Sequence, residues 1–208
     1  MPFTDITGVH SRPWNKGIIV GQKRPLSPRH VWSIRARLEL NSSVRDLVLF
    51  NLAIDSKLRA CDLVRLRIED IGSSAQVHDR ATIVQQKTGR AVRFEITEPT
   101  RQSIERWLPT LCARGSHFLF PSRERSRDHL STRQYARILH RWVESIGLET
   151  NAYGTHSLRR TKVTLLYRQT GNLRAVQLLL GHSKLESTVR YLGVEVEDAL
   201  HISEQIEL

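Results

Sequence analysis

Residues 44–54 (VRDLVLFNLAI) are the segment that most constrains the fold, because they are apolar almost all the way round a helix. A helix on the protein surface keeps one polar face, so a helix without one is expected to be buried on all sides. The rest of the 208-residue chain has to cover it. That length suffices for one domain with a sizeable core, or for one domain with a tail. The sequence therefore predicts a domain built around a buried helix.

Helical periodicity continues on both sides of this segment. Ser27 and Pro28 are residue types that favour the N-cap and the first turn of a helix. Val31, Ile34 and Leu38 follow them at helical spacing. Further helices are predicted at about residues 60–66, from Pro99 through Leu108, and at about 131–146, 156–168, 172–180, 184–191 and 195–205.

Several helix ends carry residues that favour caps. Gly171 and Gly181 follow apolar periodic segments and suit the left-handed residue that ends a helix. Ser183 and Glu186 form the S-x-x-E pattern of a capping box. These signals predict short helices separated by tight connections in the last third of the chain.

The hydrophobic period changes between residues 76 and 96. Residues 81–85 read as one strand, and residues 92–96 alternate apolar and charged side chains as a half-buried strand does. The sequence KTGR at 87–90 suits the turn of a hairpin between them, and a weaker strand is expected near Gln76. The prediction is a mainly helical α+β domain with a small three-stranded antiparallel sheet.

The charge of the chain is strongly positive. It has 32 Lys and Arg against 21 Asp and Glu, a formal net charge of +11. Such an excess attracts polyanions within a Debye length of about 8–10 Å, which makes DNA, RNA and anionic membranes candidate partners. Arginine predominates, and a guanidinium grips phosphate with two parallel hydrogen bonds. An inert basic surface is the alternative that charge alone leaves open.

Other partners and compartments are disfavoured by what the sequence lacks. No stretch approaches the roughly 20 apolar residues that cross a bilayer, and the first residues do not have the pattern of a secretory signal. Cys61 and Cys112 are too few and too far apart for a disulfide framework or a zinc site, and Cys61 is expected to be a buried thiol. We expect no membrane, no metal and no cofactor, and a bacterial cytoplasmic protein that joins the nucleoid when it is on DNA.

Five segments hold polar residues that a plain helix or turn does not need. Each has an unremarkable structural interpretation when taken alone, such as a surface arginine, a turn lysine, a capping histidine or a packing tyrosine. His156 and Arg159 are spaced i and i+3, so they share one helix face, whereas Arg160 is expected at a phosphate or in solvent. The residues are Arg59 between two apolar helices, Lys87 at the hairpin tip, the pair His156 and Arg159, His182 at the start of a helix, and Tyr191 near a helix end.

Taken in order, these residues form the pattern R…K…HxxR…GH…Y. The strings SKLRACDLVRLRIEDI, QQKTGRAVRFEI and GTHSLRRTKVTLLYRQTGNLRAVQLLLGHSKLESTVRYL carry it. In these motifs the chain resembles the catalytic domain of the tyrosine recombinase (phage integrase) family over about residues 27–195. The resemblance implies that family's catalytic-domain fold and an enzyme that breaks and rejoins DNA.

The resemblance also implies a role for each residue. Tyr191 attacks a DNA phosphodiester and forms a 3′-phosphotyrosyl bond. Arg59 and Arg159 clamp the non-bridging oxygens, where charge accumulates in the transition state. His156 is the general base or proton shuttle, and Lys87 protonates the leaving 5′-oxygen. His182 donates a hydrogen bond to the phosphate, no metal is required, and the surrounding cations are expected to favour the phenolate.

The chain departs from the family at its ends. Relatives carry an N-terminal core-binding domain of roughly 100 residues, whereas residues 1–26 here read as a basic irregular arm with Arg12, Lys16, Lys23 and Arg24. The arm is a phosphate-tracking segment or simply a leader. We therefore expect residues 27–208 to be a catalytic domain without the clamp, with weak, salt-sensitive DNA binding. A homo-oligomer on DNA, a separate partner recombinase or an accessory protein would compensate. The amphipathic end, residues 195–206, is expected to dock on a neighbour or on its own core.

Two other functions remain open at this point. A DNA-binding protein that keeps the integrase fold without recombining on its own is favoured by the missing clamp. A topoisomerase-like relaxing enzyme would use the same covalent chemistry on one duplex. The complete set of six residues favours the recombinase, and the sequence leaves its target site and oligomeric state open.

Overall fold

The computed structural model describes residues 22–73, 76–124, 126–193 and 204. Most of the predicted N-terminal arm, and the helix predicted at 195–205 apart from Glu204, lie outside these residues. The elements are α1 (Pro28–Leu40), α2 (Val44–Ser56), α3 (Ala60–Leu63), α4 (Ile68–Ile71), β1 (Arg80–Val84), β2 (Ala91–Glu95), α5 (Glu98–Ala113), α6 (Thr132–Ser145), the 3-10 turn η1 (Thr150–Ala152), α7 (Thr155–Thr170), α8 (Leu173–Leu180) and α9 (Leu185–Leu192). The predicted mainly helical α+β fold is confirmed.

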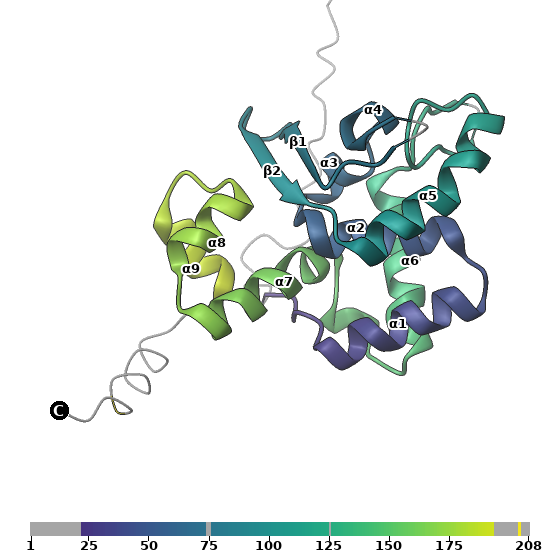
Figure 1. Cartoon of the computed structure of the whole chain (residues 1–208). Coiled ribbons are helices and arrows are strands. Elements are labelled where there is room, and N and C mark those ends of the chain that lie inside the picture. Colours follow the sequence, from purple (N-terminus) through teal and green to yellow (C-terminus); the bar gives the residue numbers. More distant parts are fainter. Residues whose placement is uncertain (1–21, 74–75, 125, 194–203, 205–208) are drawn as a thin grey trace, which may run out of the picture.

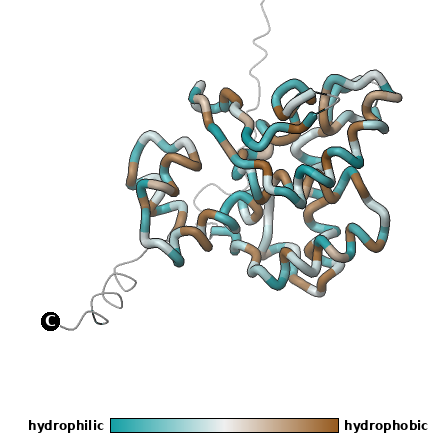
Figure 2. The backbone as a smooth tube through the Cα atoms, in the orientation of Figure 1, coloured by the Kyte–Doolittle hydropathy of each residue, from teal (hydrophilic) through white to brown (hydrophobic). Residues whose placement is uncertain are grey.

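Helix α2 occupies the centre of the fold, as its sequence predicts. Every residue from Leu47 to Ser56 is buried, and α1, α5, α7 and β2 pack around it (Figure 1). The surrounding helices alternate hydrophobic and hydrophilic residues along their turns (Figure 2), which is typical of helices that bury one face. Helix α5 buries Ile104, Trp107 and Leu108 as predicted.

The sheet in the described part of the chain has two strands, so the prediction of three is wrong. Strands β1 and β2 are antiparallel, with Arg80 opposite Glu95 and Val84 opposite Ala91. The segment near Gln76 forms only an isolated bridge between Gly72 and Val77. It pairs there because residues 76–78 fold back on the end of α4, where the His78 amide donates to the Ile71 carbonyl at 2.9 Å.

The buried hydrophobic residues form two clusters. The larger surrounds α2 and takes side chains from α1, α5, α6 and the first turn of α7. The smaller consists of Val163, Val176, Leu180 and Leu192, with Tyr191 packed against it. Helices α8 and α9 therefore form a small unit at the far end of α7, seen at the left of Figure 1.

The helix ends show which capping signals were correct. The Ser27 hydroxyl accepts from the His30 amide at 3.3 Å, and Gly171 and Gly181 end their helices with φ of 61° and 66°. The Ser183 capping box is wrong, because α9 begins one residue later behind Lys184 and has no side-chain cap. Cys61 is half-buried rather than buried. No helix in the described ranges is long and apolar enough to cross a membrane.

Candidate active site

Arg59 is placed by the sharp turn between α2 and α3. Lys57 ends α2 in the left-handed conformation with φ 54°, Leu58 is buried behind it, and Arg59 is the extended N-cap residue of α3. The Arg59 Nη1 group donates a hydrogen bond to the side-chain oxygen of Gln85, at the end of β1. The helix junction and the hairpin therefore meet at this guanidinium.

His156 and Arg159 lie on the first turns of α7, on the shared face that their spacing predicts. His156 is exposed at the helix start, while Arg159 is only 3% exposed. Arg159 Nη2 donates to the carbonyl of Leu180 at 2.8 Å. Its Nε and Nη1 groups are buried and have no hydrogen-bond partner within the described residues. Arg159 can therefore donate two further hydrogen bonds to an acceptor that enters the site.

Tyr191 and His182 come from the α8–α9 unit. His182 lies in the connection between the two helices rather than in the predicted helix start, and its Nδ1 is 3.1 Å from the Thr188 hydroxyl. The rings of His182 and Tyr191 are in edge contact, with centroids 5.4 Å apart and planes at 84°. The Tyr191 hydroxyl is buried and has no partner in the part of the chain that the structure describes.

Arg160 belongs to the same cluster, which the sequence analysis missed. The expected solvent position is wrong, because the side chain is 8% exposed, whereas the alternative of a phosphate contact stays a prediction. Nη1 donates to the Lys23 carbonyl at 2.7 Å and Nη2 to the Leu192 carbonyl at 3.3 Å. The guanidinium carbons of Arg160 and Arg159 lie 5.7 and 5.8 Å from the centroid of the Tyr191 ring. Two cations therefore flank the tyrosine.

Lys87 is exposed in the turn of the β1–β2 hairpin. It forms no hydrogen bond with the other five predicted residues in the described ranges, but its charge affects His156. Partial desolvation by the surrounding side chains lowers the pKa of His156 although its surface is still exposed, and the charges of Arg159, Arg59 and Lys87 lower it further. His156 is consequently neutral, and able to accept a proton, near pH 7.

Burial controls the ionisation of Tyr191 and His182. It raises the pKa of Tyr191 to about 12, although Arg159, Arg160 and Arg59 oppose the change. The expectation that the surrounding cations favour the phenolate is therefore correct in sign but outweighed by desolvation. Burial, with Arg159 and Arg59, lowers the pKa of His182 to about 4. In the free protein both groups are neutral.

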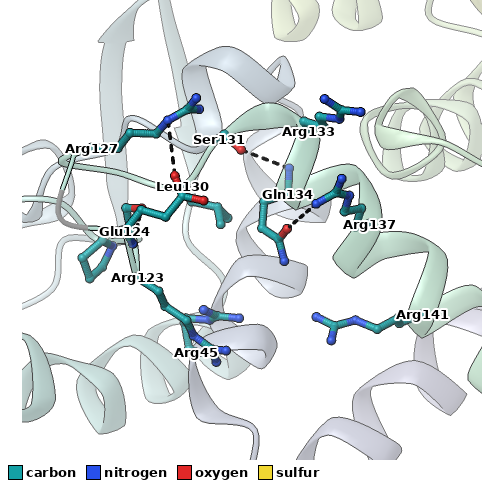
Figure 3. Close-up of a pocket in the computed structure, with 12 residues that line it drawn as sticks. Arg45, Arg123, Glu124, Arg127, Leu130, Ser131, Arg133, Gln134, Arg137 and Arg141 are labelled. Atoms are coloured by element: carbon teal, nitrogen blue, oxygen red, sulfur yellow. Dashed lines mark hydrogen bonds and ion pairs between the residues drawn. The ribbon is translucent and has the colours of Figure 1, made fainter.

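A second basic feature lies away from this cluster, over α6 and the loop before it. Arg133, Arg137 and Arg141 recur every four residues along α6, so they share one exposed face. Figure 3 shows them around a pocket whose other side is formed by Arg45, Arg123 and Arg127. Acidic partners are few: Arg45 pairs with Asp46 and Arg127 with Glu124. We call this set of six residues the arginine pocket.

A neighbouring hollow extends from the β1–β2 hairpin to the arginine pocket. It is lined by Gln86 of the hairpin and by Arg65, and also by Arg127 and Ser131, which line the arginine pocket as well. The surface is therefore continuous from the hairpin that carries Lys87 to α6. The described residues contain no group of three or more His, Cys, Asp or Glu side chains arranged to hold a metal ion.

Comparison with known proteins identifies relatives of this arrangement. Residues 25–197 match the model of the phage integrase family. The probable integrase/recombinase YoeC of Bacillus subtilis is 32% identical over 156 residues, which cover 75% of this chain and 81% of that protein. Tyrosine recombinase XerC of Psychromonas ingrahamii is 30% identical over 169 residues, 78% of this chain and 53% of XerC. The chain thus spans about half the length of the XerC relative.

Solved structures share the fold. A crystal structure of the XerA recombinase superposes with a TM-score of 0.73 at 17% identity, covering 91% of this chain and 68% of XerA. The XerH site-specific recombinase, in a post-cleavage complex with a palindromic difH substrate, gives a TM-score of 0.67 at 21% identity and covers 89% of this chain and 54% of XerH. At these identities the likeness establishes the fold.

Proposed function

The chain belongs to the phage integrase family of tyrosine recombinases, and on that premise we propose that it cleaves and rejoins DNA strands through a covalent bond to Tyr191. One observation carries the proposal. Two N–H groups of Arg159 and the hydroxyl of Tyr191 are buried together, and none of them has a hydrogen-bond partner among the described residues. Buried polar groups are rarely left unpaired, so the cluster is prepared for an oxyanion such as a phosphodiester.

The proposed cleavage uses each residue in a defined step. The Tyr191 oxygen bonds to phosphorus as the bond from phosphorus to the 5′-oxygen breaks, and the energy of the phosphodiester is kept in the phosphotyrosyl bond. His156 takes the phenol proton, which a group with a pKa of about 12 does not release unaided at pH 7. Lys87 gives a proton to the leaving oxygen.

The remaining cations hold the phosphate. Arg59 and Arg159 bind its non-bridging oxygens, where negative charge increases in the transition state, and His182 donates a hydrogen bond. The phosphate charge in turn offsets the clustered guanidinium groups, which disfavours a free phenolate, so removal of the phenol proton depends on His156. The Tyr191 hydroxyl is covered in the free protein, so the proposal requires that DNA binding uncovers it.

The arginine pocket is the proposed contact for the DNA beside the cleavage point. Its guanidinium groups suit bidentate binding of backbone phosphates, and it continues the surface that starts at the hairpin. Arg123, Arg133, Arg137 and Arg141 have no acidic partner within the described residues, so binding DNA breaks no ion pair at these four positions.

Further parts of the proposal concern organisation. Residues 27–208 form the catalytic domain and residues 1–26 a basic arm that assists DNA binding. The active form on DNA is an oligomer of this chain, alone or with a partner recombinase or accessory protein. It acts on the nucleoid in the bacterial cytoplasm.

A suicide substrate tests the proposed reaction. Nicked duplexes trap the covalent intermediate, because the short cleaved strand diffuses away. The expected result is a protein–DNA adduct on a denaturing gel that is absent in Tyr191→Phe. Binding of DNA without an adduct, across substrates that trap other family members, would instead identify a DNA-binding protein that keeps the fold without recombining. Relaxation of a supercoiled plasmid without strand exchange would identify a topoisomerase-like enzyme.

A further inference from the structure

Gln85 is a buried polar residue in the active-site cluster that the proposed chemistry does not use. It follows the last residue of β1 and is 1% exposed. Its main chain closes the hairpin: its amide donates to the Arg90 carbonyl at 2.9 Å and its carbonyl accepts from the Gly89 amide at 2.8 Å. The backbone is thus fully used by the turn, and the side chain has other partners.

The side-chain amide of Gln85 joins three elements. Its Oε1 accepts from Arg59 Nη1 and from the Thr88 hydroxyl, the latter at 3.0 Å. Its Nε2 donates to the carbonyl of Leu180 at 3.4 Å. The same carbonyl accepts from Arg159 Nη2 at 2.8 Å. One neutral amide therefore connects the Arg59 junction, the hairpin tip beside Lys87 and the end of α8, where Arg159 is also anchored.

The neutrality of this amide matters for its effect on Arg59. A carboxylate at the same place would form an ion pair with the guanidinium and cancel charge that a phosphate needs. A glutamine oxygen fixes the direction of one N–H and leaves the net charge intact. An apolar side chain of the same length would leave the guanidinium free to rotate.

We propose that Gln85 is a positioning residue that orients Arg59 toward the scissile phosphate without neutralising it. This inference rests on the proposed cleavage reaction at Tyr191. It assigns the effect to Arg59 rather than to Lys87, because the amide touches Arg59 directly and reaches Lys87 only through the backbone of the turn.

Three glutamine variants test the proposal in single-turnover cleavage of a suicide substrate. Gln85→Met removes both hydrogen-bonding atoms at nearly constant volume, and Gln85→Glu keeps the acceptor but replaces the Nε2 donor with a charged oxygen. Gln102→Met on α5, where the amide is exposed and bonds Glu98, is the matched control. We expect Gln85→Met to cleave about tenfold to a hundredfold more slowly, the loss typical of a misplaced catalytic group, with DNA affinity and thermal unfolding close to those of the control.

The glutamate variant gives a signature that a packing role does not produce. We expect it to be slower than Gln85→Met near pH 7, with its rate relative to the unchanged protein increasing as the pH falls and the carboxylate is protonated. A pH-independent ratio, or cleavage by Gln85→Met at the control rate, overturns the proposal. If the unchanged protein forms no adduct, the proposed reaction itself has failed.

A modified leaving group separates Arg59 from Lys87. A 5′-bridging phosphorothiolate expels a thiolate, which needs no proton donor because a thiol is far more acidic than an alcohol. It should restore cleavage in Lys87→Ala and leave Gln85→Met slow. Equal rescue of both variants would show that Gln85 acts through the hairpin tip and would overturn the assignment to Arg59.

Discussion

Lys57 and Glu95 form an ion pair in which one ammonium group donates to both carboxylate oxygens, each at 2.8 Å. The Lys57 side chain is 1% exposed and that of Glu95 37%. Glu95 also pairs with Lys162 at 2.6 Å, and Lys162 with Asp55 at 2.8 Å. These four charges connect α2, β2 and α7, the elements next to Arg59, Lys87 and Arg159.

The first prediction concerns which half of this pair is harder to remove. Glu95→Gln leaves a buried ammonium without its carboxylate and should lower the free energy of unfolding by about 3–5 kcal/mol. Lys57→Met leaves Glu95 half exposed and still paired with Lys162, so it should cost less. Urea unfolding of both variants measures the order, with Glu69→Gln at the exposed pair with Arg67 as control. A larger loss of stability in Lys57→Met than in Glu95→Gln would show that an unpaired buried ammonium is not the main cost of breaking the ion pair.

The free energy of unfolding of Glu95→Gln should increase with pH. Burial already lowers the pKa of Lys57 against the opposing effect of Glu95, and Glu95→Gln removes that opposition. The unfolded chain then binds more protons than the folded one, so the stability of the variant increases with pH. The difference in unfolding free energy between Glu95→Gln and the unchanged protein should therefore become smaller from neutral to alkaline pH.

The second prediction compares two helix-ending glycines. Gly171 and Gly181 both have positive φ, but a Cβ on Gly171 meets nothing within 4 Å, whereas one on Gly181 lies 2.6 Å from Val92 Cγ2 and 3.4 Å from both polar atoms of the Gln85 amide. Gly171→Ala should cost about 1–2 kcal/mol of stability, the strain of the left-handed backbone. Gly181→Ala should cost more by about 1–3 kcal/mol, because the methyl group also overpacks its surroundings.

The cleavage rates of the two alanine variants should also differ. The new methyl group of Gly181→Ala pushes against Gln85, whose amide bonds both Arg59 and the Leu180 carbonyl. The variant should therefore reduce single-turnover cleavage at a temperature where both glycine variants are folded. Gly171→Ala should not. Equal cleavage by the two variants would show that the contact of Gly181 with Gln85 has no role in the site.

The third prediction concerns the pH dependence of cleavage. The pKa of His156 is lowered from its ordinary value, so the neutral base predominates at pH 7. The rate of the unchanged protein should therefore rise in the acidic range and be level from about pH 7 to 9. In His156→Gln the phenol, with a pKa of about 12, has to ionise first. Its rate should be lower and rise about tenfold per pH unit. A level profile in that variant would remove His156 as the proton acceptor.

The fourth prediction concerns salt. If the arginine pocket binds backbone phosphates, Arg133→Ala and Arg137→Ala should each weaken DNA binding for every sequence and reduce the slope of log affinity against log salt by up to about 1. Arg168→Ala, an exposed arginine near the end of α7, is the control and should leave the slope unchanged. Fluorescence anisotropy over a salt series measures it. An unchanged slope in the α6 variants would place the DNA elsewhere.

The parts of the fold that the sequence predicts correctly are those that rest on local periodicity. The burial of α2, the hairpin and the helices that follow all come from patterns within a few residues of each other. The prediction of a third strand fails because residues 76–78 pair with the end of α4, through the bridge between Gly72 and Val77, and this tertiary contact leaves no mark in the local periodicity. The capping box of Ser183 fails because the helix starts one residue later.

In the candidate site, too, the sequence identifies some residues and misses those that only tertiary packing places there. Residue order leads to Arg59, His156, Arg159 and His182, which the structure gathers around Tyr191; their catalytic roles remain predictions. Arg160 and Gln85 were missed for a common reason. Helical geometry points Arg160 away from Arg159, and only the tertiary packing of residues 22–26 and α9 shows that this side is covered. Gln85 has no sequence signal beyond its place before the turn.

The small size of the second hydrophobic cluster gives the two halves of the site unequal stability. Arg59 lies between Leu58 and Leu63 of the large core, whereas α9 packs on the small cluster of four buried side chains in the described residues and accepts a hydrogen bond from Arg160 at the Leu192 carbonyl. Segments with few buried contacts open at lower free energy than the core. Amide hydrogens of α9 should therefore exchange with solvent well before those of α2. Such opening exposes the Tyr191 hydroxyl while the rest of the molecule stays folded.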